Sequence, residues 1–149
     1  MHNIAQIDIG ELISVKDTLC ATLPPEQRVD GVYRELETML LTLSKFYLQT
    51  DLIRKDSEKL IWFDEKGAFK VSVGGDGAPF GKWDESMSWL VTFLNVGARV
   101  ASPNDNFLLF GANCKEDHPA VRLFTKQLAS QSEEIEQKTC MVSGIQLTF

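Results

Sequence analysis

The chain lacks the features of a membrane protein, a secreted protein and a zinc protein. No apolar run approaches the ~18 residues that a membrane-spanning helix requires. Residues 1–8 lack the basic and apolar regions of a signal peptide, so we expect an intracellular protein. The three cysteines, Cys20, Cys114 and Cys140, are far apart and form no CxxC pair. We therefore expect free, mostly buried thiols rather than a disulfide framework or a zinc site.

An excess of positive charge is also missing, because the formal net charge is −6. Proteins that grip the nucleic-acid backbone are usually basic where they contact it. This balance argues against a stand-alone DNA-binding module, but it does not exclude a catalytic core that holds cations with carboxylates. Apolar residues make up 44% of the 149 residues and charged residues 24%, as in an ordinary globular protein of one domain, or one domain with an appendage.

The first part of the chain, residues 1–59, predicts a helical N-terminal segment. A short amphipathic segment is expected at Leu12–Leu19. From Glu26 to about Gln49 apolar residues recur every three or four positions, which predicts a helix with one face against the core. Residues 51–59 are charged and predict a second short helix or a loop.

The second part, residues 60–149, alternates strand-like and turn-like segments. The expected elements are strands at 68–73, 87–96, 107–110 and 141–149, a polar loop at 74–86, and a helix from Asp117, as its cap, to about Gln137. Three consecutive strands with short connections predict an antiparallel meander, and a helical crossover then predicts a fourth strand parallel to the first. The predicted fold class is α+β: N-terminal helices followed by an incomplete RNase H-like fold.

One octapeptide, Val71–Ala78, places an aspartate between glycines at the expected end of the first of these strands. Glycines on both sides of Asp76 would let a metal ion, a phosphate or another backbone come close. Asp-Gly is also a common turn dipeptide, so taken alone Asp76 is better explained as a turn residue.

Three places in the second part resemble the catalytic core of cut-and-paste DDE transposases. They are Val73–Gly77, Phe107–Asn113 with Glu116–His118, and Glu133–Ile135 with Gly144–Phe149. They resemble, in turn, the strand end with the first catalytic aspartate, the third strand with the acidic entry to the first core helix, and the end of that helix with the fourth strand. The most similar group contains the Transib transposases and the catalytic subunit of the V(D)J recombinase.

The resemblance implies a catalytic, metal-binding role for Asp76 and an auxiliary metal-binding role for Glu116, with Mg²⁺ or Mn²⁺ as the cofactor. In the family the second aspartate follows the fourth strand and the glutamate comes later, so both would lie beyond Phe149. Residues 60–149 would then be the N-terminal half of an RNase H-like core, truncated after the fourth strand. One strong acid cannot hold two Mg²⁺ ions, so we expect no phosphodiester chemistry from this chain alone. The resemblance further implies DNA as the partner of the full-length protein, a homodimer and a nuclear location.

Other residues are weaker candidates for function. Trp83 and Lys82, in the expected loop, are candidate nucleic-acid contacts, since aromatic rings stack on bases. Trp89 is expected in the core, and His118 is expected to have a structural or capping role. Two alternatives stay open: a non-catalytic interaction module on an RNase H-like scaffold, and an unrelated α+β domain in which Asp76 only makes a turn.

Overall fold

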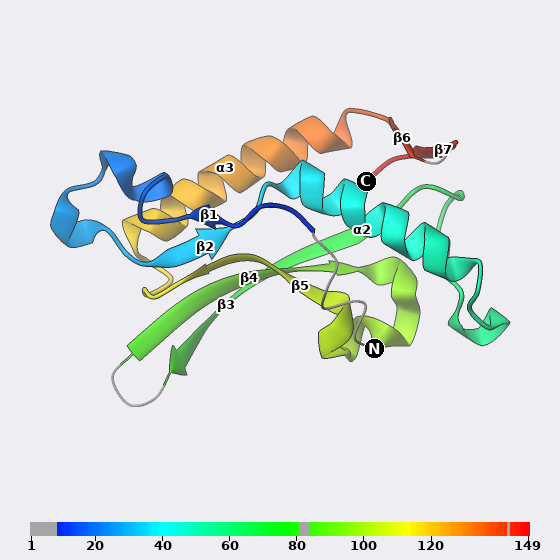
Figure 1. Cartoon of the computed structure of the whole chain (residues 1–149), viewed down its shortest axis with the longest axis horizontal. Helices are drawn as coiled ribbons and strands as arrows, with labels where there is room; N and C mark the ends of the chain where they lie inside the picture. Colours follow the sequence, from blue (N-terminus) through cyan, green and yellow to red (C-terminus); the bar gives the residue numbers. More distant parts are fainter. Residues whose placement is uncertain (1–8, 81–83, 143) are drawn as a thin grey trace.

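The computed structural model describes residues 9–80, 84–142 and 144–149 of the chain. It is a mixed α+β structure in which two long helices lie along one face of a five-stranded antiparallel sheet (Figure 1). The strand order in this sheet is β1-β2-β5-β4-β3, and β6 and β7 form a separate two-stranded sheet. The strands are β1 (Ile13–Ser14), β2 (Gly31–Tyr33), β3 (Val71–Phe80), β4 (Asp84–Phe93), β5 (Asn106–Ala112), β6 (Cys140–Val142) and β7 (Ile145–Leu147). The α-helices are α2 (Leu36–Asp51) and α3 (Pro119–Glu136), and the 3-10 helices are Leu19–Thr22, Pro25–Gln27, Asp56–Glu58, Leu94–Ala101 and Pro103–Asp105.

The predicted three-strand meander is confirmed. β3 and β4 pair antiparallel along their whole length, and β4 then pairs antiparallel with β5. The pairing of β4 with β5 shifts register between Trp89 and Leu90. The helix predicted after the meander is also present, as α3.

The prediction of one long helix from Glu26 is wrong, because α2 begins only at Leu36. The preceding residues form β2, in which Val32 and Tyr33 pair with Gly111 and Phe110 of β5. The spacing of apolar residues continues smoothly from strand to helix, so periodicity alone did not show the break. The segment expected at Leu12–Leu19 is likewise not a helix but the short strand β1, followed by the 3-10 helix Leu19–Thr22. The sheet thus includes residues from both predicted parts of the chain.

The predicted polar loop at 74–86 is also wrong. β3 continues to Phe80 and β4 already begins at Asp84, so the two strands form a hairpin that extends past the end of β5 (Figure 1). Glycine and serine are poor strand formers, but here the hydrogen-bonded partner strand outweighs their local preference. Asp76 therefore lies within β3, opposite Ser88, and not at the end of the strand.

The predicted final strand, 141–149, is divided into the β6–β7 hairpin. Gly144 connects the two strands with a left-handed φ of 80°, a conformation that favours glycine. Beyond β7, Thr148 forms an isolated parallel bridge with Ala68, just before β3. The N–H of Phe69 donates to the carbonyl of Thr148 (2.9 Å), and the N–H of Thr148 donates to the carbonyl of Gly67 (3.0 Å). A full fourth strand along β3 is not formed.

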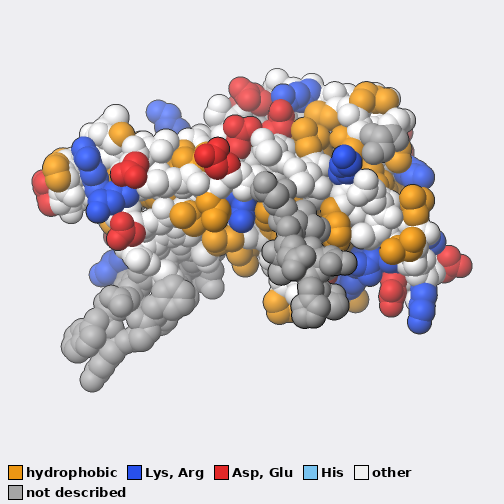
Figure 2. All heavy atoms as spheres, viewed as in Figure 1, with side chains coloured by type: hydrophobic (Ala, Val, Ile, Leu, Met, Phe, Trp, Pro, Cys, Tyr) orange, Lys and Arg blue, Asp and Glu red, His pale blue; other side chains and the backbone are white. Residues whose placement is uncertain are grey.

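The core lies between the helices and the sheet. Phe110 of β5 stacks on Phe124 of α3 with ring centroids 4.5 Å apart, and Tyr47 of α2 packs on Phe93 of β4 at 5.3 Å. Leu90, next to the buried Val91 in β4, is 38% exposed. On the face shown in Figure 2, acidic and basic side chains are interspersed. In the described part of the chain, no helix has the length and apolar character needed to cross a bilayer.

Candidate functional site

A row of paired residues crosses the sheet at the position of Asp76. Asp76 pairs with Ser88, Ser88 with Gly111, and Gly111 with Val32. Neighbouring strands are about 4.8 Å apart, so the backbone of Asp76 is one strand from Ser88 and two strands from Gly111. The backbone of Asp76 is described, whereas its side chain lies outside the described part of the structure.

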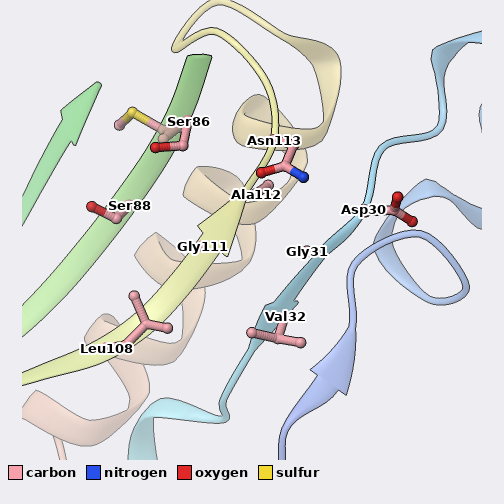
Figure 3. Close-up of a pocket in the computed structure, with 10 residues that line it drawn as sticks. Asp30, Gly31, Val32, Ser86, Ser88, Leu108, Gly111, Ala112 and Asn113 are labelled. Atoms are coloured by element: carbon pink, nitrogen blue, oxygen red, sulfur yellow. The ribbon is translucent and has the colours of Figure 1, made fainter. Parts of the chain in front are cut away.

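A pocket of about 360 Å³ opens beside this row (Figure 3). Its lining comes from β2, β4, β5 and the adjoining residues: Asp30, Gly31, Val32, Ser86, Met87, Ser88, Leu108, Gly111, Ala112 and Asn113. Gly111 leaves the middle of the wall open, because a Cβ built there would meet only the side chain of Leu108, at 3.5 Å or more. In Figure 3, Val32 of β2 and Ser88 of β4 lie on either side of β5. The pocket therefore offers apolar surface together with the polar side chains of Ser86, Ser88, Asp30 and Asn113.

The other predicted site residues are not gathered at this row. Glu116 is exposed, in the turn between β5 and α3. Lys82 and Trp83 lie outside the described residues. Among the described residues, no three histidine, cysteine, aspartate or glutamate side chains come together to hold a metal ion, a statement that does not extend to the carboxylate of Asp76. The metal-binding roles of Asp76 and Glu116 stay predictions.

The capping role predicted for His118 is confirmed. Its Nδ1 atom accepts a hydrogen bond from the N–H of Ala120 (3.0 Å), and Pro119 occupies the first turn of α3. Asp117, which the sequence favoured as the cap, lies one residue too early. The cap uses Nδ1 as an acceptor, so His118 is a structural residue here.

Trp89 explains one of the glycines beside Asp76. Trp89, which the sequence predicts in the core, is only half-buried and packs against the core, with its ring 6.3 Å from that of Phe124. It pairs with Gly75, and a Cβ on Gly75 would lie 2.8 Å from the Trp89 ring. Gly75 thus makes room for an indole ring of the protein itself, rather than for a phosphate or a metal ion. Gly74 has no neighbour within 4 Å of a built Cβ.

Asn95 joins the segment around Ile61 to the segment just before β3, and nothing in the local sequence indicates this role. Its side chain is fully buried. Nδ2 donates to the carbonyl of Ile61 (2.7 Å), and Oδ1 accepts from the N–H of Lys70 (2.8 Å). Asn95 therefore fixes the chain on both sides of the turn that precedes β3.

A second buried pair, Tyr47 and Asp105, joins α2 to the residues before β5. The hydroxyl of Tyr47 donates to Oδ1 of Asp105 at 2.8 Å. Burial, and then the hydrogen bond to the Asp105 carboxylate, hold the pKa of Tyr47 well above its ordinary value. A tyrosine in the apolar stripe of a helix is usually an ordinary core residue. The hydrogen-bond partner of Tyr47 could therefore be found only from the structure.

No protein-family model matches the chain, and no curated protein matches it in sequence. The functional proposal therefore rests on the topology of the sheet and on the positions of individual residues.

Proposed function

We propose that the chain is part of a metal-dependent transposase or recombinase that cleaves and transfers DNA strands, built on an RNase H-like core. The observation that supports this most is the parallel bridge between Thr148 and Ala68. It comes after the β3-β4-β5 meander and α3, in the chain order that this fold requires. The proposal keeps the expected location in the nucleus and DNA as the partner of a longer protein.

The bridge lies on the side of the first strand that an RNase H-like fold requires for the fourth strand. The carbonyl of Lys70 accepts from the N–H of Leu94, on the side of β4 (2.8 Å). Phe69, the preceding residue, pairs with Thr148 instead. Successive residues of an extended segment direct their backbone groups to opposite sides, so Thr148 lies on the side opposite β4, beside the residues just before β3. In an RNase H-like sheet the fourth strand occupies this position.

In this proposal Asp76 and Glu116 are the carboxylates that this chain supplies to a Mg²⁺ or Mn²⁺ site. Hard cations of this kind prefer carboxylate oxygens. When bound, a pair of such ions would stabilise the attacking and leaving oxygens of a phosphodiester. Further carboxylates are needed for that pair, so the chain alone is expected to bind metal weakly and to cleave nothing.

Paramagnetic broadening by Mn²⁺ tests the site. At low Mn²⁺ concentration, the amide signals of Ser88 and Gly111 should broaden first, because both share the row of Asp76. Asp76→Asn should remove this selectivity. Asp56→Asn is the control, because Asp56 is exposed and lies in the 3-10 helix Asp56–Glu58, outside the row of Asp76. This variant should leave the selective broadening of Ser88 and Gly111 unchanged. Equal broadening of Ser88 and Gly111 in the wild type and in Asp76→Asn would rule out the metal site.

A second candidate is a non-catalytic interaction module on the same scaffold, which the pocket at Gly111 favours. Its apolar surface suits an apolar side chain of a partner protein. Gly111→Leu would add a side chain to the pocket wall, at a position where a Cβ contacts only the side chain of Leu108. If the interaction module is correct, Gly111→Leu lowers the recovery of a co-purified partner and Asp76→Asn does not. If the transposase proposal is correct, Asp76→Asn changes the response to Mn²⁺ and Gly111→Leu does not.

A further inference from the structure

Two of the three free cysteines belong to the same part of the core. Cys20, in the 3-10 helix Leu19–Thr22, is 0% exposed, and Cys114, between β5 and α3, is 7% exposed. The 3-10 helix that holds Cys20 contacts α3. Cys140, the third cysteine, is at the start of β6 and is more exposed.

A short series of backbone hydrogen bonds brings the two buried cysteines to the same end of β2. The N–H of Cys20 donates to the carbonyl of Val15, and the N–H of Val15 donates to the carbonyl of Gly31 (both 2.9 Å). This series places the 3-10 helix of Cys20 against the first residue of β2.

Cys114 reaches the same point from the other side. The N–H of Asn113, its neighbour in sequence, donates to the carbonyl of Asp30 at 2.9 Å, and Gly31 pairs with Ala112. The segments of both cysteines are therefore hydrogen-bonded to the adjacent residues Asp30 and Gly31.

The Cys114 thiol is in an apolar environment and close enough to Cys20 to be affected by its charge. Burial raises the pKa of Cys114 to about 11, and the neighbouring Cys20 and Asp117 contribute to this rise. At neutral pH Cys114 is a protonated thiol, so it reacts slowly as a nucleophile until it loses its proton.

We propose that Cys20 and Cys114 are a redox pair that closes to an intramolecular disulfide when a small-molecule disulfide is present. Whichever of the two cysteines reacts first does so as its thiolate: it attacks one sulfur of the small disulfide and releases one small thiol. The second cysteine then attacks the protein sulfur of this mixed disulfide and releases the second small thiol. Two protein thiols are oxidised, one small disulfide is reduced, and the two protons pass to the released thiols.

The structure indicates how an oxidant would reach these buried sulfurs. β1, next to the Cys20 segment, is only 2 residues long and is the edge strand of the sheet. Edge segments with few hydrogen bonds open locally at low cost in free energy. A disulfide would tie this edge to the start of α3 and prevent such opening.

Peptide mapping after oxidation tests the proposal. The folded chain is incubated with oxidised glutathione, blocked with N-ethylmaleimide and digested, and the linked peptides are identified by mass spectrometry. We expect a Cys20–Cys114 linkage, with Cys140 blocked or bound to glutathione. Cys140→Ser should keep the linkage and Cys114→Ser should abolish it.

A thermal measurement on Cys140→Ser adds an independent readout. Because the disulfide would close a long loop, oxidation should raise the unfolding midpoint by roughly 10 °C, and dithiothreitol should reverse the rise. The proposal fails if wild-type Cys20 and Cys114 both stay reduced under conditions that modify Cys140. It also fails if Cys20 and Cys114 become linked only in denaturant.

Discussion

At the scale of single residues, Gly74 and Gly75 are neighbours in β3 with opposite tolerance for a side chain. A Cβ on Gly75 would meet the Trp89 ring at 2.8 Å, whereas a Cβ on Gly74 meets nothing within 4 Å. We expect Gly75→Ala to destabilise the protein by about 1–3 kcal/mol, because the half-buried indole ring of Trp89, packed against Phe124, would have to shift to make room for the methyl group.

Gly74→Ala is the matched control for this prediction, and its effect should stay within about 0.5 kcal/mol. Urea unfolding of both variants, followed by tryptophan fluorescence, measures the difference. Equal losses of stability in the two variants would mean that Trp89 does not set the requirement for glycine.

At the scale of secondary-structure elements, the start of α3 depends on an imidazole cap. His118→Ala should lower the free energy of unfolding by about 1 kcal/mol, since the N–H of Ala120 loses its acceptor. His118→Asn should restore most of this loss, because an asparagine side chain can accept the same bond. Asp117→Ala, one residue outside the cap, should cost less than His118→Ala in the same denaturation experiment; the reverse order would contradict the observed cap.

The segment between α2 and β3 depends on Asn95. In Asn95→Ala the carbonyl of Ile61 and the N–H of Lys70, both only partly buried, lose their partner, at a total cost of about 1–3 kcal/mol. We expect faster hydrogen exchange of the Lys70 amide and earlier proteolysis in the segment 60–70.

Asn106→Ala is a suitable comparison, because Asn106 also donates to backbone carbonyls, those of Val100 and Ser102, but in a different turn. It should leave the exchange of the Lys70 amide unchanged. A faster Lys70 exchange in both variants would indicate a general loss of stability rather than a local release.

At the scale of the whole molecule, stability should fall at alkaline pH. Burial holds the pKa of Tyr33 and Tyr47, the two tyrosines of the chain, above the ordinary value of 10.0. Their contribution is complete below about pH 10, and it is lost as the pH rises further, because the unfolded chain then gives up phenolic protons that the folded chain retains.

Urea unfolding of the wild type and Tyr47→Phe between pH 8 and pH 11 would measure this loss. The variant should be less stable at pH 8, because Asp105 loses the hydrogen bond from Tyr47. Above about pH 10 its stability should decline less steeply than that of the wild type. Parallel pH profiles would show that Tyr47 does not contribute to the alkaline loss.

Much of the fold could be predicted, and the reasons differ from element to element. The second half of β4 and most of β5 are apolar, and α3 has both a strong start signal and an apolar stripe, so local sequence is sufficient for these parts. β2 and the outer part of β3 could not be predicted, because their residues are ordinary or poor strand formers that are held by partners distant in the chain. Of the candidate site, Asp76 could be selected from the sequence, but its place within a strand and the adjacent pocket could not.

Local sequence was enough for the α+β class, the order of meander and helix, the separation of the cysteines and the position at which α3 starts, although it favoured Asp117 rather than His118 as the cap. These properties depend on residues close together in the chain, where periodicity and capping chemistry act. Four other features could be found only in the folded structure. They are the addition of β2 to the sheet, the need for glycine at position 75 beside Trp89, the bridge between Thr148 and Ala68, and the location of Cys20 and Cys114 in one region of the core. Each of these depends on contact between segments far apart in sequence, and such contacts are fixed by packing and hydrogen bonding across the whole fold rather than by local preference.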